Sequence, residues 1–263
     1  MTGAWVMAVG GIDPSGGAGL SVDRKAIEAA GLHCVAFVTA ETDQDDGAVR
    51  SLGARPADLW LGECLQRADS GEPRAVKFGL LPGILALQAA TQLVDRLLAR
   101  APDLPVVLDP VLRSSSGFEF LGPEELPALV ELCRRPVILT PNLPELAALT
   151  GRRLSDLLVD LGQRHAAAQE LLRGGLRAVV VKDGHGDGAS ICDWLHVGED
   201  HGGGEPRAVR RPRIRTGGGR ATIRGTGCRF ASHMAADLGQ GHSLFEAVRR
   251  AGDWVSEEIS KGS

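Results

Sequence analysis

The residue types best suited to chemistry stand together in Gly225-Thr226-Gly227-Cys228, at the start of a segment with helical periodicity. Thr226 can cap this helix, and the backbone amides of Gly225, Thr226 and Gly227 would then converge where the helix dipole favours an anion. A transferring phosphate group needs such positioned donors rather than covalent chemistry. We therefore predict a phosphate-binding turn at this point of the chain.

Cys228 lies in the first turn of the same predicted helix. The helix dipole is expected to lower the pKa of a thiol there, so that Cys228 could accept a proton from an attacking hydroxyl group or contact a substrate carbon. Free cysteines are also common as small core residues. Taken alone, the residues around Cys228 favour this second, purely structural role.

Oxygen-bearing side chains follow two of the predicted strands. Asp109 comes directly after one strand, and Asn142 and Glu145 follow another. In an open α/β sheet, ligands gather beyond the carboxyl ends of the strands, so these side chains could act on Mg²⁺ directly or through waters. Asn142 and Glu145 also have the spacing of a helix N-cap and its partner, which supports a structural role at least as well. The two roles can coexist.

A glycine-rich segment, residues 10–19, follows the first predicted strand, and Asp23 lies one turn into the next helix. The segment lacks the Gly-Lys-Ser/Thr ending of a P-loop and the G-x-G-x-x-G pattern of dinucleotide-binding turns. A tight turn and close approach of the backbone to a ligand explain the glycines equally well.

Short apolar runs alternate with longer segments of helical period along the whole chain. This alternation predicts a central, mostly parallel sheet between two layers of helices, a three-layer α/β/α fold. Strands are expected at residues 5–9, 34–39, 75–78, 105–108, 137–139 and 178–181. Helices are expected at residues 20–30, 56–67, 84–99, 124–133, 144–150, 156–173, 226–238 and 244–260. Residues 201–220 are interpreted as a surface loop joined to a short edge strand at 211–215.

Composition restricts the class of protein. A chain of 263 residues, 43% of them hydrophobic, is long enough for one large domain, and we expect a single domain over residues 1–263. The formal net charge of -4 gives no general attraction to nucleic acids or to anionic membranes. The five cysteines form no C-x-x-C pair, and no apolar run is long enough to span a membrane. We predict a cytoplasmic protein with a small-molecule partner.

Seven short motifs occur in an order that identifies a family. The chain resembles the hydroxymethylpyrimidine/phosphomethylpyrimidine kinase family of thiamine biosynthesis, within the ribokinase-like superfamily, nearly from end to end. The motifs are Asp13-Pro14-Ser15-Gly16-Gly17-Ala18-Gly19 with Asp23, Thr39-Ala40 with Gln44, Lys77-Phe78-Gly79-Leu80-Leu81, Asp109-Pro110-Val111, Thr140-Pro141-Asn142-Leu143-Pro144-Glu145, Val181-Lys182-Asp183-Gly184-His185 and Gly225-Thr226-Gly227-Cys228.

The resemblance implies an ATP-dependent phosphorylation. The acceptor would be the hydroxymethyl group of 4-amino-5-hydroxymethyl-2-methylpyrimidine and then the resulting monophosphate, with Mg²⁺ as cofactor and a homodimer as the assembly. The implied pyrimidine-binding residues are Gly11, Asp23, Gln44 and Leu80. Cys228 would stand at the position of the general base.

The same resemblance assigns the nucleotide side. Lys182 would contact the ATP phosphates, together with Asn142 and Thr226. Asp109, Asn142 and Glu145 would hold the metal ion.

The chain departs from the family pattern near the expected phosphates. Ser115 stands where relatives have a lysine, a loss that Arg113 could offset. Arg224 and Arg229 flank the Gly225–Cys228 turn, and Asp183 adds a carboxylate that would repel phosphate unless it faces a cation or solvent. Two alternatives to the pyrimidine kinase therefore stay open: a pyridoxal or pyridoxine kinase, and a catalytically silent pyrimidine-binding relative.

Overall fold

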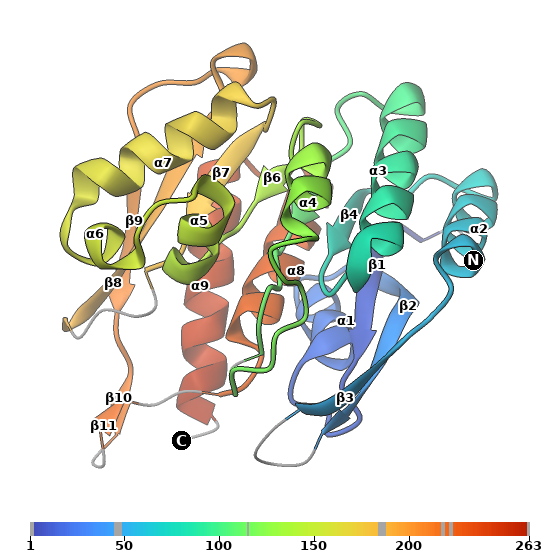
Figure 1. Ribbon diagram of the computed structural model, residues 1–263, viewed down its shortest axis with the longest axis horizontal. Helices are drawn as coiled ribbons and strands as arrows, with labels where there is room; N and C mark the ends of the chain where they lie inside the picture. Colours follow the sequence, from blue (N-terminus) through green and yellow to red (C-terminus); the bar gives the residue numbers. More distant parts are fainter. Residues whose placement is uncertain are drawn as a thin grey trace.

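The computed structural model describes residues 3–44, 49–114, 116–183, 188–216, 219–220 and 223–261. These residues build one nine-stranded sheet in the order β3-β2-β1-β4-β5-β6-β7-β8-β9 and a small two-stranded sheet of β10 and β11 (Figure 1). The strands are β1 Trp5–Ile12, β2 His33–Gln44, β3 Val49–Ala54, β4 Ala75–Phe78, β5 Val106–Leu108, β6 Ile138–Leu139, β7 Ala178–Val181, β8 Ser190–Val197, β9 Arg207–Pro212, β10 Arg215–Thr216 and β11 Gly219–Arg220.

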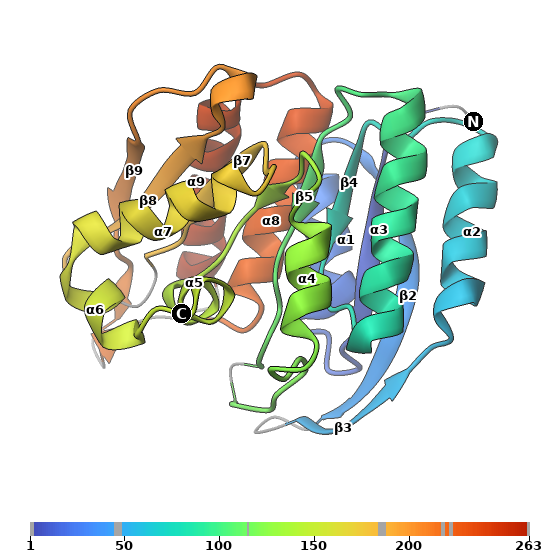
Figure 2. The ribbon, with the colours of Figure 1, turned by 45° about the horizontal axis from the view of Figure 1, so that its top comes forward.

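Helices cover both faces of the large sheet. Helices α1, α8 and α9 lie on one face, and α2, α3, α4, α5 and α7 lie on the other (Figures 1 and 2). The helices are α1 Gly19–Ala29, α2 Ala57–Asp69, α3 Gly83–Arg100, α4 Leu126–Leu132, α5 Leu143–Thr150, α6 Leu154–Val159, α7 Leu161–Arg173, α8 Thr226–Gly239 and α9 Leu244–Lys261, with a 3-10 turn η1 at Glu199–His201. The predicted three-layer α/β/α fold is confirmed.

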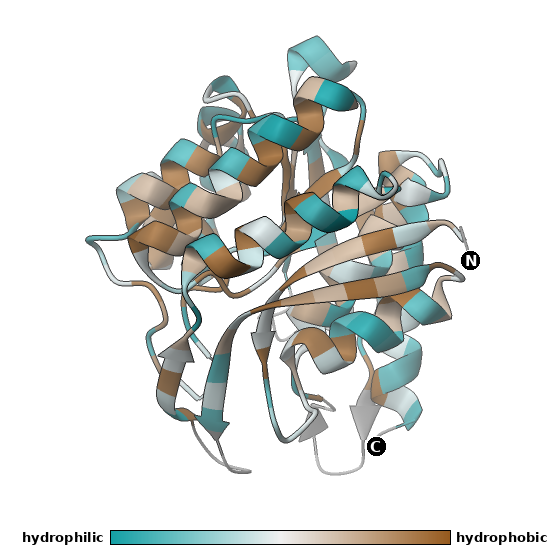
Figure 3. Ribbon diagram, turned by 90° about the vertical axis from the view of Figure 1, so that its right-hand side faces the viewer, coloured by the Kyte–Doolittle hydropathy of each residue, from teal (hydrophilic) through white to brown (hydrophobic). Residues whose placement is uncertain are grey.

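The alternation of side chains along β1 explains the two cores. Trp5, Met7 and Val9 are buried in the core beneath α2, α3 and α5, whereas Val6 and Ala8 are buried beneath α1 and α8. Successive strand residues point to opposite faces, so a strand covered on both sides must be apolar throughout. In Figure 3 the long strands that face the viewer are hydrophobic along much of their length, while the helices carry both hydrophobic and hydrophilic residues.

The direction of the strands places the site. Strands β2, β1, β4, β5, β6 and β7 are parallel, so their carboxyl ends meet at one edge of the sheet. The chain passes from β1 to β2 on one side and later returns to β4 on the other side of β1. Ligands of open α/β sheets bind beyond the carboxyl ends at such a switch point.

The strand predictions need correction at β1, β3, β8 and β9, and β2 runs past its predicted end at residue 39 to Gln44. β1 continues to Ile12, because Gly10 and Gly11 pair with Val38 and Ala40 of β2 across an irregularity in the register. The antiparallel strands β3 and β8 were not predicted, since β3 is mostly exposed and β8 mixes polar with apolar residues. The segment at 201–220 does contain an edge strand, as predicted, but this strand, β9, lies at Arg207–Pro212 rather than at 211–215.

One helix prediction was also wrong, because residues 156–173 do not form a continuous helix. Instead, α6 ends at Val159 and α7 begins at Leu161. The Asp160 side chain accepts hydrogen bonds from the backbone amides of Gly162 and Gln163, at 2.7 and 3.2 Å. Such an N-cap satisfies amides that are free at a helix start, so it stabilises a new helix at this residue.

A histidine pair, with His196 buried and His165 half-buried, joins α7 to β8. The Nδ1 atom of His165 lies 3.3 Å from Nε2 of His196, and His196 is 1% exposed. Desolvation by burial, reinforced by His165, lowers the pKa of His196 to about 4. The unfolded chain would bind a proton at this residue near pH 6.5, so stability is complete above that pH and is lost as the pH falls toward 4.

We predict that this histidine makes the fold sensitive to acid. Between about pH 7 and about pH 5 the free energy of unfolding should fall by about 2 kcal/mol through His196. The measurement is urea unfolding at both pH values for the wild-type protein and for His196→Gln, which cannot titrate. An equal loss in both proteins would show that other groups cause the acid sensitivity.

In the described part of the chain, no helix is both long and apolar enough to cross a membrane.

Candidate active site

A cavity of about 850 Å³ opens at the carboxyl ends of the parallel strands. Nearly all the predicted site residues line it: Gly11, Asp23, Leu80, Asp109, Asn142, Glu145, Lys182, Gly225, Thr226, Gly227 and Cys228. Gln44 is the last residue of β2, and its side chain lies outside the described part of the structure. The fold therefore brings together residues that are far apart in the sequence.

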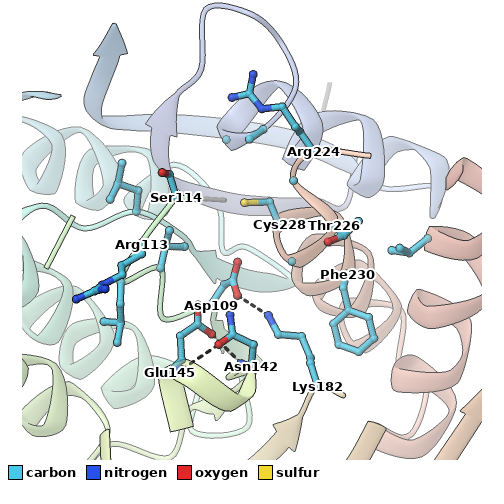
Figure 4. A pocket seen from close by; sticks show the side chains of 18 of the residues that line it. Asp109, Arg113, Ser114, Asn142, Glu145, Lys182, Arg224, Thr226, Cys228 and Phe230 are labelled. Atoms are coloured by element: carbon cyan, nitrogen blue, oxygen red, sulfur yellow. Dashed lines mark hydrogen bonds and ion pairs between the residues drawn. The ribbon is translucent and has the colours of Figure 1, made fainter. Parts of the chain in front are cut away.

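The strand order divides this cavity into two ends. The β1 end is formed by residues that follow or neighbour β1 and β2, and the β7 end by residues on or near β6 to β9 and α9. The residues that define the β1 end are Gly11, Asp13, Ala18, Gly19, Thr42 and Leu80. The residues that define the β7 end are Asn142, Glu145, Lys182, Ile191, Ile214 and Ile259. Cys228 and the start of α8 lie between the two ends (Figure 4).

Backbone geometry makes glycine necessary at Gly225. This residue, not Thr226, is the N-cap of α8, and its φ of 70° lies in the left-handed region. A Cβ atom at Gly225 would stand 2.7 Å from the carbonyl oxygen of Gly17. The prediction that Thr226 caps the helix is wrong, because no side chain makes a capping hydrogen bond there. The amino end of α8 thus packs closely against the glycine-rich turn that follows β1.

Lys182 and Asp109 meet at Gly227. The Nζ atom of Lys182 donates to Oδ1 of Asp109 at 2.9 Å, and a Cβ atom at Gly227 would lie 3.3 Å from that Nζ. Burial acts to lower the pKa of Lys182, but the charges of Asp109 and Glu145 raise it. The lysine therefore stays a cation beside the amino end of α8. The charge of Lys182 and the dipole of α8 both favour a bound anion there.

Asn142 and Glu145 form the capping box of α5, as one of the two sequence interpretations predicted. The Glu145 amide donates to Oδ1 of Asn142 at 2.9 Å, and the Asn142 amide donates to Oε2 of Glu145 at 2.8 Å. Desolvation raises the pKa of Glu145 to about 8, with Asp109 adding to the rise and Lys182 opposing it. Burial, with a smaller contribution from the charge of Asp109, thus disfavours the ionised form of Glu145 unless a further cation stabilises it.

The donor set fits a magnesium ion. Among the described residues no group of three or more His, Cys, Asp or Glu side chains gathers, but Asp109 and Glu145 supply two carboxylates and Asn142 an amide oxygen. Mg²⁺ commonly binds through one or two carboxylates, several waters and substrate phosphates rather than through a full protein cage.

The thiol of Cys228 does not have the lowered pKa that its place in the helix predicted. Desolvation raises its pKa to about 12; Lys77 opposes the rise, and Asp23 and Asp109 add to it. The helix dipole lowers the pKa of this thiol by less than the loss of hydration raises it. Without substrate, Cys228 is therefore a neutral thiol at pH 7.

Sequence reasoning assigned no role to Lys77, which lies on the floor of the β1 end. Its Nζ atom donates to both carboxylate oxygens of Asp23, at 2.8 and 2.9 Å, and the Ser232 hydroxyl donates to Asp23 at 2.8 Å. Lys77 and Asp23 are each fully buried. The signal was present in the sequence, because a lysine inside the buried strand β4 needs a charged partner.

The departures from the family pattern are now placed as follows. Arg113 pairs with the exposed Glu119 at 2.5 Å. The added carboxylate of Asp183 faces a cation, since it accepts from Arg164 at 3.0 Å. Arg229 donates to the carbonyl oxygens of Gly17 and Arg224, which ties α8 to the glycine-rich turn. Ser115 lies outside the described residues.

The β7 end has an apolar wall, and the charged side chains of Asp193, Arg211 and Arg213 also line the cavity. The apolar wall is built by side chains from β8, α8 and α9 and from the segment after β9, namely Ile191, Ile214, Phe230, Val255 and Ile259. A flat apolar ring could be bound there, with its polar groups directed toward Lys182.

The fold and the cavity together define a ribokinase-like α/β protein whose cavity reaches the glycine-rich start of α8. The model of the family described as "Phosphomethylpyrimidine kinase" matches residues 13–263. The hydroxymethylpyrimidine/phosphomethylpyrimidine kinase of Streptomyces coelicolor is 33% identical over 258 residues, which cover 98% of this chain and 89% of that protein. The chain therefore belongs to the phosphomethylpyrimidine kinase family.

Two solved structures and a longer relative complete the comparison. The phosphomethylpyrimidine kinase of Clostridium difficile 630 superposes with a TM-score of 0.77 and 26% identity, covering 97% of this chain and 99% of that one. The ADP complex of Bacillus subtilis pyridoxal kinase gives a TM-score of 0.80 and 25% identity, covering 95% and 90%. The thiamine biosynthesis multifunctional protein of Corynebacterium efficiens is 33% identical over 97% of this chain, which spans only 32% of that relative's length.

Proposed function

We propose that this protein transfers the γ-phosphate of ATP to the hydroxymethyl group of 4-amino-5-hydroxymethyl-2-methylpyrimidine and then to the resulting monophosphate. One observation carries the proposal: the Gly225–Cys228 turn, Lys182 and Asp109 share one cavity with the residues predicted to bind the pyrimidine. Family membership supports the same activity.

The β1 end is the proposed acceptor site. Gly11 and Leu80 lie side by side in the wall of this end, because a Cβ atom at Gly11 would stand 2.8 Å from Cδ2 of Leu80. Asp23 and Gln44 are proposed to hydrogen-bond the aminopyrimidine, with the Asp23 charge held in place by Lys77. Cys228 then faces the hydroxymethyl group, and its thiolate form, a minor species at pH 7 because of the raised pKa, accepts the proton as the oxygen attacks phosphorus.

The β7 end is the proposed donor site. The ATP phosphates would be contacted by Lys182, Asn142 and Thr226. The backbone amides at the start of α8 would stabilise the negative charge on the phosphoryl group during its transfer. Asp109, Asn142 and Glu145 would hold Mg²⁺, which supplies positive charge to the β- and γ-phosphates. The apolar wall of this end would receive the adenine ring.

A pyridoxal or pyridoxine kinase is the second candidate, and the likeness to the Bacillus subtilis enzyme favours it. A substrate panel separates the two. Purified protein with Mg-ATP is offered the hydroxymethylpyrimidine, its monophosphate and pyridoxal, and ADP release is followed in a coupled assay. We expect kcat/KM for the hydroxymethylpyrimidine to exceed that for pyridoxal at least tenfold.

Two results would contradict this expectation. A preference for pyridoxal would establish the second candidate. Pyrimidine binding by calorimetry without any ADP release would establish a catalytically silent relative. Omission of Mg²⁺ is the matched control, because turnover that persists without a divalent cation would exclude the proposed role of Asp109 and Glu145.

The remaining expectations are proposals too. We propose that residues 1–263 act as one catalytic domain, that the protein works as a homodimer, and that it resides in the cytoplasm. The five cysteines, all of which fall in described segments, form no disulfide, which supports a reducing compartment. Sedimentation equilibrium of the purified protein tests the dimer.

A further inference from the structure

Arg224 directly precedes the anion-binding turn and lines the cavity. It stands on the opposite side of Cys228 from Lys182, with its guanidinium group directed away from Asp109 and Glu145 (Figure 4). Its location is the β1 end, because its hydrogen-bond partners belong to the turn after β1. Arg224 is therefore separated from the proposed nucleotide phosphates and adjacent to the proposed acceptor.

Two contacts of the guanidinium group join it to described residues of the turn after β1. Nη2 donates to Oδ2 of Asp13 at 3.1 Å, and Nη1 donates to the Ser15 hydroxyl oxygen at 3.1 Å. The stem of Arg224 lies against Gly17, where a Cβ atom would be 3.5 Å from it. Arg229 bonds to the Arg224 carbonyl oxygen, so the backbone at this residue is fixed independently of its side chain.

Asp13 can share the arginine with a second anion. Its other oxygen, Oδ1, accepts from the amide of Ser15 at 2.9 Å and from the hydroxyl of Ser15 at 2.7 Å. These two bonds leave the buried Asp13 carboxylate hydrogen-bonded if the guanidinium group of Arg224 turns toward a ligand. The planar fork of arginine presents several donors, which suits simultaneous contact with a carboxylate and a phosphate.

The charges at the β1 end single out this residue. Two of the described cations that line the cavity, Lys77 and Arg224, bond to residues of this end, whereas Arg113 pairs with the exposed Glu119. Lys77 is fully buried and bonded to Asp23, whereas the Arg224 side chain is 34% exposed. A hydroxymethylpyrimidine is uncharged at this end and requires no such cation, but a phosphomonoester does.

We infer that Arg224 contacts the phosphate of the phosphorylated acceptor and thereby specifies the second transfer. This inference rests on the proposed function. In that step a phosphate oxygen of the monophosphate attacks the γ-phosphorus of ATP, one P–O bond forms, and the bond to the bridging oxygen of ADP breaks with its electron pair leaving on ADP. The monophosphate reacts as its dianion, so no proton has to be removed; Arg224 offsets the repulsion between the two anions.

The test compares both acceptors in Arg224→Gln, Arg224→Lys and the wild-type protein. For the monophosphate, Arg224→Gln should lower kcat/KM roughly tenfold to a hundredfold, mainly by raising KM, because a charge-assisted contact is lost. For the hydroxymethylpyrimidine the change should stay below about threefold. Arg224→Lys should recover part of the loss. Calorimetry should show the same weakening for the monophosphate without nucleotide present. Arg249→Gln, on the exposed surface of α9, is the control for loss of one positive charge.

A merely structural role of Arg224 predicts a different pattern. If the arginine only fastens the turn after β1, Arg224→Gln and Asp13→Asn will impair both acceptors equally, and the inference is overturned. Unchanged kinetics for both acceptors overturn it as well. A wild-type protein that phosphorylates the hydroxymethylpyrimidine but neither binds nor phosphorylates the monophosphate overturns the inference alone. A wild-type protein inactive with both acceptors overturns the proposed function.

Discussion

Replacing Lys77 with methionine is expected to lower the free energy of unfolding by about 3 to 5 kcal/mol. Lys77 and Asp23 form an ion pair between β4 and α1 with both side chains fully buried. Burial acts to lower the pKa of Lys77, but the charges of Asp23 and Asp109 raise it, so the lysine is charged in the fold. The substitution roughly keeps the volume and leaves the Asp23 carboxylate, within the described part of the chain, with Ser232 as its remaining hydrogen-bond donor.

Urea unfolding of the wild-type protein, Lys77→Met and the double variant Asp23→Leu/Lys77→Met measures this effect. The double variant should be more stable than the single one, because it leaves no buried charge without a partner. Lys25→Met, on the exposed side of α1, is the control for removal of a lysine. A loss below about 1 kcal/mol in Lys77→Met would mean that water or a local rearrangement compensates Asp23, and the pair would then not be a main determinant of stability.

The Lys77–Asp23 pair shows which features of the site can be predicted from patterns in the sequence. The strand, the helix and the position of Asp23 at the cavity follow from hydrophobic periodicity, because strands and helices have different periods. The identity of the partner of Asp23 cannot be predicted from this periodicity. Lys77 is 54 residues away in the sequence, and the pairing of β1 with β4 in the sheet brings it under α1. A charged residue in an apolar strand signals that a partner exists without naming it.

The start of α8 shows the opposite limit. The Gly225–Cys228 turn was predicted correctly as a cavity-lining helix start, since glycine spacing and the helix pattern are local. The capping role of Thr226 was wrong because the glycine-rich turn after β1 packs against Gly225 and forces its left-handed conformation. The pKa of Cys228 was wrong for a related reason. Desolvation depends on what surrounds the thiol in space, which the residues next to it in sequence do not specify.

Burial of Cys228 leads to the second large effect. If its thiolate removes the proton of the hydroxymethyl group, Cys228→Ala should lower kcat for that acceptor roughly a hundredfold to ten-thousandfold. The monophosphate, which carries no proton at the attacking oxygen when it is a dianion, should lose much less. Coupled assays with each acceptor, for Cys228→Ala and for Cys228→Ser, measure the difference. Retention of more than about a tenth of the activity in Cys228→Ala would remove the thiol from the mechanism.

The pH profile gives an independent test of the same residue. The free enzyme holds Cys228 as a thiol with a pKa of about 12, so the reactive thiolate grows with pH. Because kcat/KM reports the pKa values of the free enzyme, it should rise about tenfold per pH unit between about pH 7 and about pH 9 with the hydroxymethylpyrimidine. Cys228→Ala should lack this slope. A flat wild-type profile would show that the proton leaves by another route, in which the turn at Gly225 and the charge of Lys182 carry the transfer without a base.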